Sequence, residues 1–360
     1  MLNKRLDIEL MRIIAAFFVI FNHTENVGFF LFSLYDAHSI QYWIYLFISI
    51  FCKFSVPLFF MISGALMLER QPESVKDLWC HRIFHICVII GVWSFFYYML
   101  AVKEGYETFN MYHFLTRLYD SNWNGSYWYL YTYLSLLISL PLLQRIAQNL
   151  RDRDYVYMMI LYSVFNMVVP SLQYLLWQGR HALNTNISVG WFASNIVIFP
   201  FAGYFLSCRV KNFWNKKRIL LLWIINIGTI LLSCYLTYYQ AKITGVCEEK
   251  SSQMFHSTFD LVNSMAIFVT CQYIGEHSEV LWKMRRAIIS VGGCTFGIYL
   301  LHIGIKDYTS LSAYMQQALG KQMQTSPMLY AFLYCGVIFI CGYIVSAVLK
   351  RIPFLRRFIS

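Results

Sequence analysis

The stretch RIIAAFFVIFNHTENVGFF, residues 12–30, decides how the chain is interpreted. Nine apolar residues follow Arg12 without interruption, which is typical of a helix that crosses a membrane. His23, an ionisable side chain, then interrupts the apolar run, which resumes towards Phe32. The run is long and lacks a small-residue cleavage site, so we interpret it as an uncleaved first span rather than a signal peptide. The stretch therefore predicts a membrane protein with a titratable group inside its first helix.

The composition of the whole chain agrees with this interpretation. Of 360 residues, 58% are hydrophobic, 19% are aromatic and only 13% are charged, which lies outside the usual range of soluble domains. There is no fixed-period repeat and no shift in composition, so residues 1–360 are expected to form one integral membrane domain. The predicted fold is an all-α, polytopic membrane bundle of about ten transmembrane helices. The expected spans are residues 11–32, 41–68, 83–101, 127–143, 155–177, 190–208, 219–240, 255–274, 287–305 and 328–349.

The distribution of basic residues predicts the orientation of these spans. With the N-terminus inside, 21 of the 29 Lys and Arg residues fall in cytoplasmic segments and seven in external ones, while Lys53 lies within the second span. Cytoplasmic loops carry such an excess of positive charge, so both termini are expected in the cytoplasm. The net charge of +11 is explained by this rule and by attraction to anionic membrane lipid. It requires no nucleic acid partner.

His23 is the first candidate for chemistry. His23 lies eleven helical positions after Arg12, which places it roughly 16 Å deeper, near the middle of the bilayer. A polar side chain there must face the bundle interior or a hydrated cavity. His23 is either a structural histidine bonded to a neighbouring helix or a general base, since imidazole accepts and returns a proton near neutral pH. The adjacent residues Asn22, Thr24 and Glu25 form a polar patch that favours a hydrated cavity.

Four stretches in order along the chain resemble a known family. They are RLDIELMRIIAAFFVIFNH (residues 5–23), VPLFFMISGALML (56–68), WYLYTYLSLLISLPLL (128–143) and FGIYLLH (296–302). Together they resemble the acyltransferase family 3 membrane proteins, which O-acetylate cell-surface polysaccharides and related acceptors. In that family the core has ten spans, and His23 matches the position of the expected catalytic histidine.

The resemblance implies an O-acyltransferase of a bacterial plasma (inner) membrane. The acyl donor would be cytoplasmic acetyl-CoA as co-substrate, and the acceptor a hydroxyl of a cell-surface polysaccharide or lipid-linked glycan. No metal or bound prosthetic group is expected. Acyl transfer from a thioester needs a base and a group that stabilises the oxyanion. Whether His23 activates the acceptor hydroxyl directly or is itself transiently acylated stays open.

Four residues are candidates for binding the donor. Arg12 lies at the cytoplasmic edge of the first span, and Arg82 and His85 begin the third. The family usually carries an Arg-x-x-Arg pair here, which suits phosphate contacts, but this chain has histidine in the second place. Arg82 also fits an orienting charge at a span end. Lys53, inside the second span, is the fourth candidate, as a cation that either lines a cavity or pairs with an acid.

On the acceptor side the candidates are Tyr127, Trp128, Tyr299 and His302. Aromatic rings near the outer interface pack well on sugar rings, although an interfacial aromatic belt has the same composition. Tyr299 and His302 share one helix face by their spacing of three. His302 fits a role in holding the acceptor or completing a proton path, and equally a structural role.

Two other classes of function also fit a ten-helix bundle with polar residues at its centre. One is a secondary transporter or flippase, which usually shows internal repeats and acidic residues within spans. The other is a non-catalytic uptake or sensing module on the same scaffold. The absent repeat, the few acids in spans, and the pairing of Arg12 with His23 at the family spacing favour the enzyme.

Overall fold

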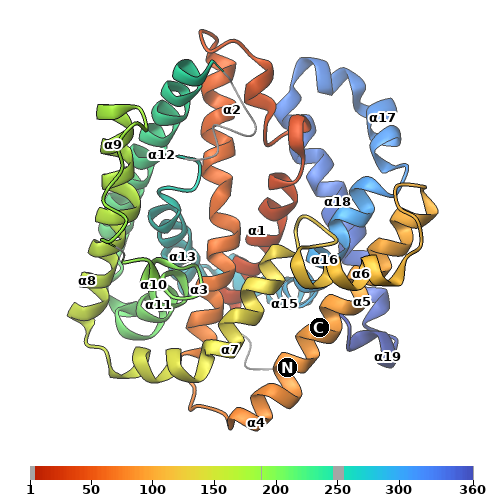
Figure 1. The fold of residues 1–360 in the computed structure, drawn as a ribbon, viewed down its shortest axis with the longest axis horizontal. Coiled ribbons are helices and arrows are strands. Elements are labelled where there is room, and N and C mark those ends of the chain that lie inside the picture. The colour runs from red at the N-terminus through yellow and green to blue at the C-terminus, as the bar shows by residue number, and fades with distance from the viewer. Residues whose placement is uncertain (1–4, 188, 246–254, 360) are drawn as a thin grey trace.

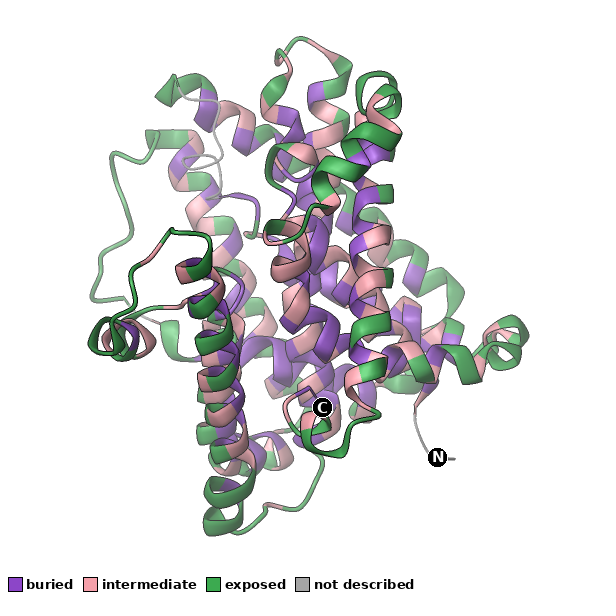
Figure 2. Ribbon diagram, turned by 90° about the vertical axis from the view of Figure 1, so that its right-hand side faces the viewer, coloured by how far each residue is buried: buried purple, intermediate pink, exposed green. Residues whose placement is uncertain are grey.

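A computed structural model describes residues 5–187, 189–245 and 255–359 (Figure 1). Helices make up 79% of the structure, and no β-strand occurs in the described ranges. The predicted all-α class is therefore confirmed. Buried residues gather in the interior of the bundle, whereas exposed residues cover the outer helices and the connecting loops (Figure 2).

Six helices in the described ranges are long and apolar enough to cross a membrane. A seventh span results if α15 (Arg285–Gly292) and α16 (Thr295–Asp307), which are bent by 57° at a short break, are counted together. The chain is thus a multi-pass membrane protein, while the total of ten spans and the cytoplasmic termini stay predictions. The six are Ile40–Met67, Val75–Lys103, Trp128–Asn149 (α7), Asp152–Trp177, Lys216–Thr244 (α12) and Pro327–Leu349 (α18).

Several of these long helices contain local changes in winding. The second expected span consists of α2 (Ile40–Phe51), a 3₁₀ turn (Cys52–Phe54) and α3 (Ser55–Met67). The third consists of α4 (Val75–Asp77), a π-helical segment (Leu78–Ile83) and α5 (Phe84–Lys103). The fifth is similarly built from α8 (Asp152–Tyr162), a π-helical segment (Ser163–Val168) and α9 (Val169–Trp177).

The first helix differs from its expected span of residues 11–32. Helix α1 (Leu6–Asn22) begins earlier and ends at Asn22, and His23 is its C-cap. The Thr24 hydroxyl donates to the carbonyl of Phe21 (2.6 Å) and accepts from the N–H of Phe29 (3.0 Å), which folds the following residues back on the helix end. Two 3₁₀ turns follow, Glu25–Val27 and Leu31–Leu34. The prediction that His23 lies inside a continuous helix is therefore wrong.

The sixth and eighth expected spans also differ. Residues 190–208 form two short helices, α10 (Gly190–Ala193) and α11 (Ile198–Tyr204), followed by a π-helical turn (Phe205–Arg209). Pro200 lies in the first turn of α11, where a missing N–H is tolerated, so the helix begins late. The eighth span is α13 (Asp260–His277), which begins five residues after the expected start. High apolar content alone does not reveal these helix starts.

Helix α1 lies in the middle of the bundle (Figure 1) and packs against α3, α13, α15, α16 and α18. Helices α3 and α11 also pack closely. The evidence is that a Cβ atom built at Gly64 would collide with the backbone of Pro200. A Cβ at Gly203 would likewise collide with the backbone of Met61. Small residues permit this kind of close backbone contact between membrane helices.

Side-chain amides bond to the break between α2 and α3. Asn22 Nδ2 donates to the Ser55 hydroxyl (2.9 Å) and to the carbonyl of Cys52 (3.4 Å), and Asn263 Nδ2 donates to the carbonyl of Phe51 (2.7 Å). Carbonyl groups at a change of helical winding inside a bundle need such partners. The break is thus held by α1 on one side and α13 on the other.

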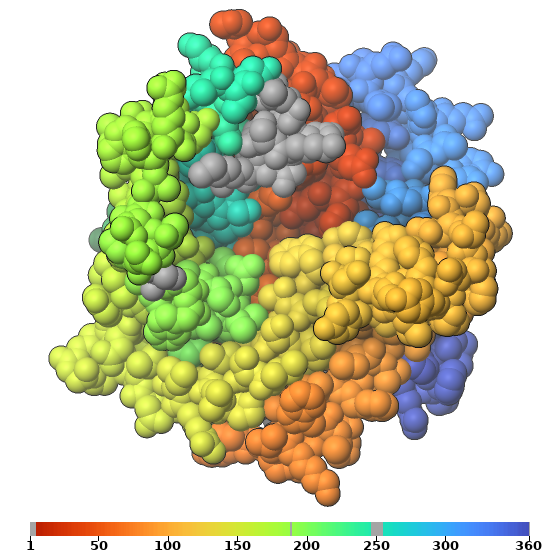
Figure 3. Space-filling model, in the orientation of Figure 1, coloured from red at the N-terminus to blue at the C-terminus, as the bar shows by residue number. Residues whose placement is uncertain are grey.

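Two further helices lie outside the expected spans, α6 (Met111–Asp120) and α17 (Leu311–Thr325). Helix α6 and the start of α7 form the front of the molecule in the space-filling view (Figure 3). Helix α4 lies in the lower part of the view (Figure 1). The short helices α14 (Glu279–Lys283) and α19 (Pro353–Arg356) complete the fold.

Candidate active site

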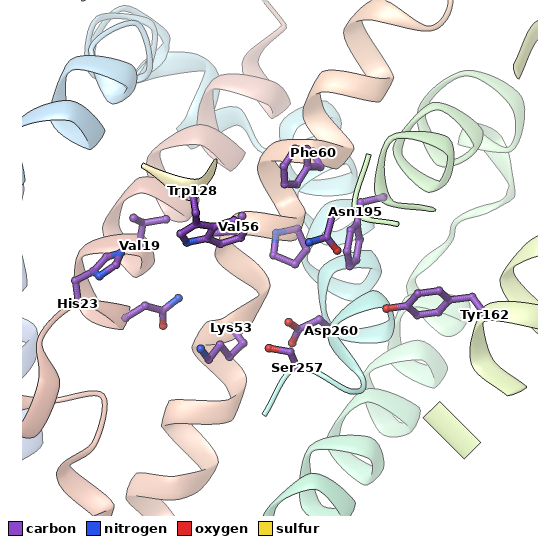
Figure 4. Close-up of a pocket in the computed structure, with 13 residues that line it drawn as sticks. Val19, His23, Lys53, Val56, Phe60, Trp128, Tyr162, Asn195, Ser257 and Asp260 are labelled. Atoms are coloured by element: carbon purple, nitrogen blue, oxygen red, sulfur yellow. The ribbon is translucent and has the colours of Figure 1, made fainter. Parts of the chain in front are cut away.

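His23 opens onto a pocket of about 220 Å³ in the interior of the bundle (Figure 4). The pocket is lined by side chains from six segments that are far apart in the sequence, so only the tertiary structure assembles it. Its lining is part polar and part aromatic. The lining residues are Val19, Asn22, His23, Lys53, Val56, Pro57, Phe60, Trp128, Tyr162, Asn195, Phe199, Ser257 and Asp260.

A second histidine lies directly beside His23. The ring centroids of His23 and His302 are 5.2 Å apart. His302 is buried, and its Nδ1 lies 2.6 Å from the carbonyl oxygen of Tyr299. Since a carbonyl only accepts, Nδ1 carries the proton, and Nε2 of the neutral ring is an acceptor. No hydrogen-bond partner of Nε2 is present in the described part of the chain. The Nε2 atom of His302 is therefore an unused hydrogen-bond acceptor close to His23.

Lys53 and Asp260 bring an amine and a carboxyl group into the same pocket. Lys53 lies in the 3₁₀ turn between α2 and α3, and Asp260 is the first residue of α13. In Figure 4 Lys53 lies between His23 and Asp260. The ammonium group also lies 4.6 Å from the ring centroid of Phe29, a cation–π contact. The pocket therefore presents a base, a cation and a carboxyl group to one small volume.

Sequence reasoning missed Asp260. It occurs within the expected eighth span, residues 255–274, and an acid inside a span is by default a candidate functional residue. That signal was present in the sequence. Asn195 and Ser257, within the expected sixth and eighth spans, carried a weaker signal, because uncharged polar residues are more common in membrane helices than charged ones.

A larger cavity of about 740 Å³ lies along the opposite part of α1 and α3. Six basic side chains line it, and no Asp or Glu is among its lining residues in the described part of the chain. Two of the arginines form ion pairs with acids just outside the lining: Arg12 with Glu9 (2.9 Å) and Arg82 with Glu73 (2.6 Å). We call this the cationic cavity. Its basic residues are Arg12, Arg70, Arg82, His85, Lys350 and Arg356.

Aromatic rings separate the two cavities. Phe60 lines the His23 pocket, and its ring centroid lies 5.0 Å from that of Tyr129, which lines the cationic cavity. Tyr129 in turn lies 5.5 Å from Tyr299, and Tyr299 lies 5.9 Å from His302. A row of ring contacts thus leads from the wall of the cationic cavity to His302 and on to His23.

The structure brings together three of the four residues expected to bind the donor. Arg12, Arg82 and His85 line the cationic cavity, although they come from α1 and from the segment that precedes and begins α5. Lys53 lies elsewhere, in the His23 pocket. Lys53 lies in the middle of its span, Ile40–Met67, and therefore beside His23, whereas Arg12 and Arg82 lie nearer the beginnings of their spans.

The four residues expected on the acceptor side lie in different places. Trp128 lines the His23 pocket and His302 lies beside it, but Tyr299 lines the cationic cavity. Tyr127 is fully buried and lines neither cavity. Its ring packs edge-on against Tyr97, with centroids 5.7 Å apart. Its position favours a packing role.

The described residues include no group of three or more His, Cys, Asp or Glu side chains placed to hold a metal ion. The positive charge of the cationic cavity instead suits an anionic small molecule.

Comparison with known proteins decides the family. A family model described as an acyltransferase domain, of acyltransferase family 3, matches residues 5–347, which is nearly the whole chain. The chain belongs to acyltransferase family 3. Membership in this family, together with the apolar helices, makes it a multi-pass membrane acyltransferase. Searches among curated proteins and among solved structures found no match.

Proposed function

We propose that this family member transfers an acetyl group from cytoplasmic acetyl-CoA to a hydroxyl of a cell-surface polysaccharide or lipid-linked glycan. One observation carries the proposal: helix α1 lines the cationic cavity with Arg12 and the polar pocket with His23. The two side chains are eleven residues, or roughly 16 Å, apart along the helix. A donor with a charged end and a reactive end needs such a separation between its binding group and the catalytic base.

The cationic cavity is the proposed donor site. Acetyl-CoA has a phosphate-bearing nucleotide at one end and a thioester at the other. Guanidinium groups bind phosphate in a bidentate manner, so Arg12, Arg70 and Arg82 suit the nucleotide end. The aromatic wall at Tyr129 and Tyr299 then faces the thioester arm, which must pass it to reach His23. The donor site faces the cytoplasm in this proposal.

The His23 pocket is the proposed acceptor site. Its Trp128 and Phe60 rings offer apolar faces, and Lys53, Asn195 and Asp260 offer hydrogen-bonding groups. Sugar rings have both apolar faces and hydroxyl edges, so this mixture suits one ring of a glycan. The pocket volume of about 220 Å³ also favours a single ring over an extended chain.

The reaction in this proposal is direct attack by the acceptor. His23 accepts the proton of the acceptor hydroxyl while the hydroxyl oxygen bonds to the thioester carbonyl carbon. The Lys53 ammonium group is the candidate for stabilising the oxyanion that forms. Collapse of the intermediate breaks the carbon–sulfur bond and releases CoA thiolate, which takes the proton from His23. The products are the acetyl ester and CoA. Transient acylation of His23 is the alternative route, and it gives the same two products.

The family match favours this function over a transporter or a non-catalytic module. The test is the transfer of labelled acetyl groups from acetyl-CoA into surface glycans in membranes. The parent, His23→Ala and the control His181→Ala, an exposed histidine, are compared at matched expression. We expect label with the parent and the control and none with His23→Ala. Equal labelling by all three would remove His23 from the mechanism, and uptake of glycan without CoA release would favour a transporter.

A further inference from the structure

The chain turns back onto the bundle after α18. Residues 350–359, here called the C-terminal segment, follow Leu349 and contain the short helix α19. Trp93 Nε1 on α5 donates to the carbonyl of Phe358 (2.8 Å), and Ile359 is only 1% exposed. The segment is thus docked on the bundle. It lies beyond residue 347, where the family match ends.

Two cations of the C-terminal segment line the cationic cavity. They are Lys350 and Arg356, which join Arg12, Arg70 and Arg82 from other segments. Lys350 Nζ also donates to the carbonyl of Gly293, which is itself part of the cavity lining. The family match thus accounts for three of these five cations, and the C-terminal segment adds the other two.

The position of Arg356 indicates which part of a ligand it meets. Arg356 is exposed to solvent, whereas Tyr299 on the same cavity is buried. The cavity therefore has a wet, cationic mouth and an aromatic inner wall. A phosphate group keeps part of its hydration at such a mouth, while an uncharged arm suits the interior.

We propose that Lys350 and Arg356 bind the phosphate groups of the acyl-CoA donor, so that the C-terminal segment completes the donor site. This inference rests on the proposed function. An anionic lipid headgroup offers the same phosphate chemistry to cations at a membrane boundary. The experiment therefore separates nucleotide from lipid.

The test measures the equilibrium binding of labelled acetyl-CoA to the purified full chain in nanodiscs, which requires no acceptor. Arg356→Gln is compared with Arg357→Gln, which removes the same charge from the next residue. Arg357 is also exposed but is not among the cavity-lining residues. We expect the dissociation constant to rise roughly fivefold for Arg356→Gln, as for one partly solvated charge contact, and to stay unchanged for Arg357→Gln.

Trp93→Phe supplies a second variant, because it keeps an aromatic ring and removes the hydrogen bond to Phe358. We expect it to weaken acetyl-CoA binding less than Arg356→Gln does. The binding is repeated in nanodiscs of phosphatidylcholine alone and with added phosphatidylglycerol. A donor contact predicts the Arg356→Gln effect in both lipids.

The outcomes separate the two proposals. Parent protein that binds no acetyl-CoA would overturn the proposed function. Parent protein that binds it, with equal dissociation constants for the parent and Arg356→Gln, would overturn the role of the C-terminal segment alone. An effect seen only with phosphatidylglycerol would assign Arg356 to lipid and likewise overturn that role. Equal weakening of binding by Arg357→Gln would show that net charge alone causes the effect, and would also overturn the specific contact.

Discussion

The His23 pocket and the cationic cavity share three helices, α1, α3 and α7, yet their charges come from different kinds of position. In the cavity Arg12 and Arg82 lie near the beginnings of their helical spans with partly exposed side chains, and Lys350 is the C-cap of α18. In the pocket Lys53 lies in a winding break and Asp260 begins α13 at a buried position. Charges of the first kind remain near water, whereas the second kind is tolerated only where the bundle supplies a cavity or a partner. In the proposed function, the cationic cavity binds the donor and the His23 pocket carries out the transfer.

His23→Ala is the strongest test of whether the two regions have separate functions. We expect acetyl transfer to fall by at least about a hundredfold, because a general base is lost, while the dissociation constant for acetyl-CoA stays at the parental value. Labelled transfer in membranes and labelled binding to purified protein measure the two quantities. If binding and transfer fall together, the two regions are not functionally separate.

Helix α3, which lines both regions, gives the next test. Gly64→Ala forces α3 away from the backbone of Pro200 on α11, so both regions should suffer. We expect a loss of about 1–3 kcal/mol in stability, measured as a lower midpoint of thermal unfolding in detergent. The control is Gly91→Ala on α5, where an added Cβ has open space and the helix gains propensity. Equal midpoints for the two variants would refute close packing of α3 on α11.

Asp260→Asn sharpens the comparison within the pocket, because it keeps the shape of the side chain and removes its ionisable group. We expect transfer to fall about tenfold through weaker acceptor binding, with acetyl-CoA binding unchanged. Asp120→Asn, at an exposed position that lines neither cavity, is the control. The measurement is the initial transfer rate over a range of acceptor concentrations. An unchanged acceptor dependence would exclude Asp260 from the acceptor site.

Arg82→Gln is expected to give the smallest effect, because the Arg82 side chain is partly exposed and already paired with Glu73. The dissociation constant for acetyl-CoA should rise roughly three- to fivefold, and the difference from the parent should shrink at high salt as screening increases. Binding is measured in low and high KCl, with the exposed Arg145→Gln as control. An effect that is independent of salt would argue against an ionic contact at this position.

Much of the fold was predictable because membrane helices are marked by long apolar runs. The expected tenth span, residues 328–349, matches α18 (Pro327–Leu349) to within one residue. The expected sixth span fails because Pro200 allows a helix to begin only just before it. The first span ends early because the Thr24 side chain competes for backbone groups at the helix end. Hydropathy measures solubility in lipid and does not register either effect.

The sequence by itself determined the all-α membrane class, the family motifs, and the separation of eleven residues between Arg12 and His23. These depend on local composition and on separation along the chain. Only the tertiary structure decided that Lys53 shares a pocket with Asp260, that Tyr299 lines the cationic cavity, and that the C-terminal segment reaches that cavity. Contacts between distant segments depend on where helices bend and how closely they pack, because a small change in either moves a side chain from one cavity to another.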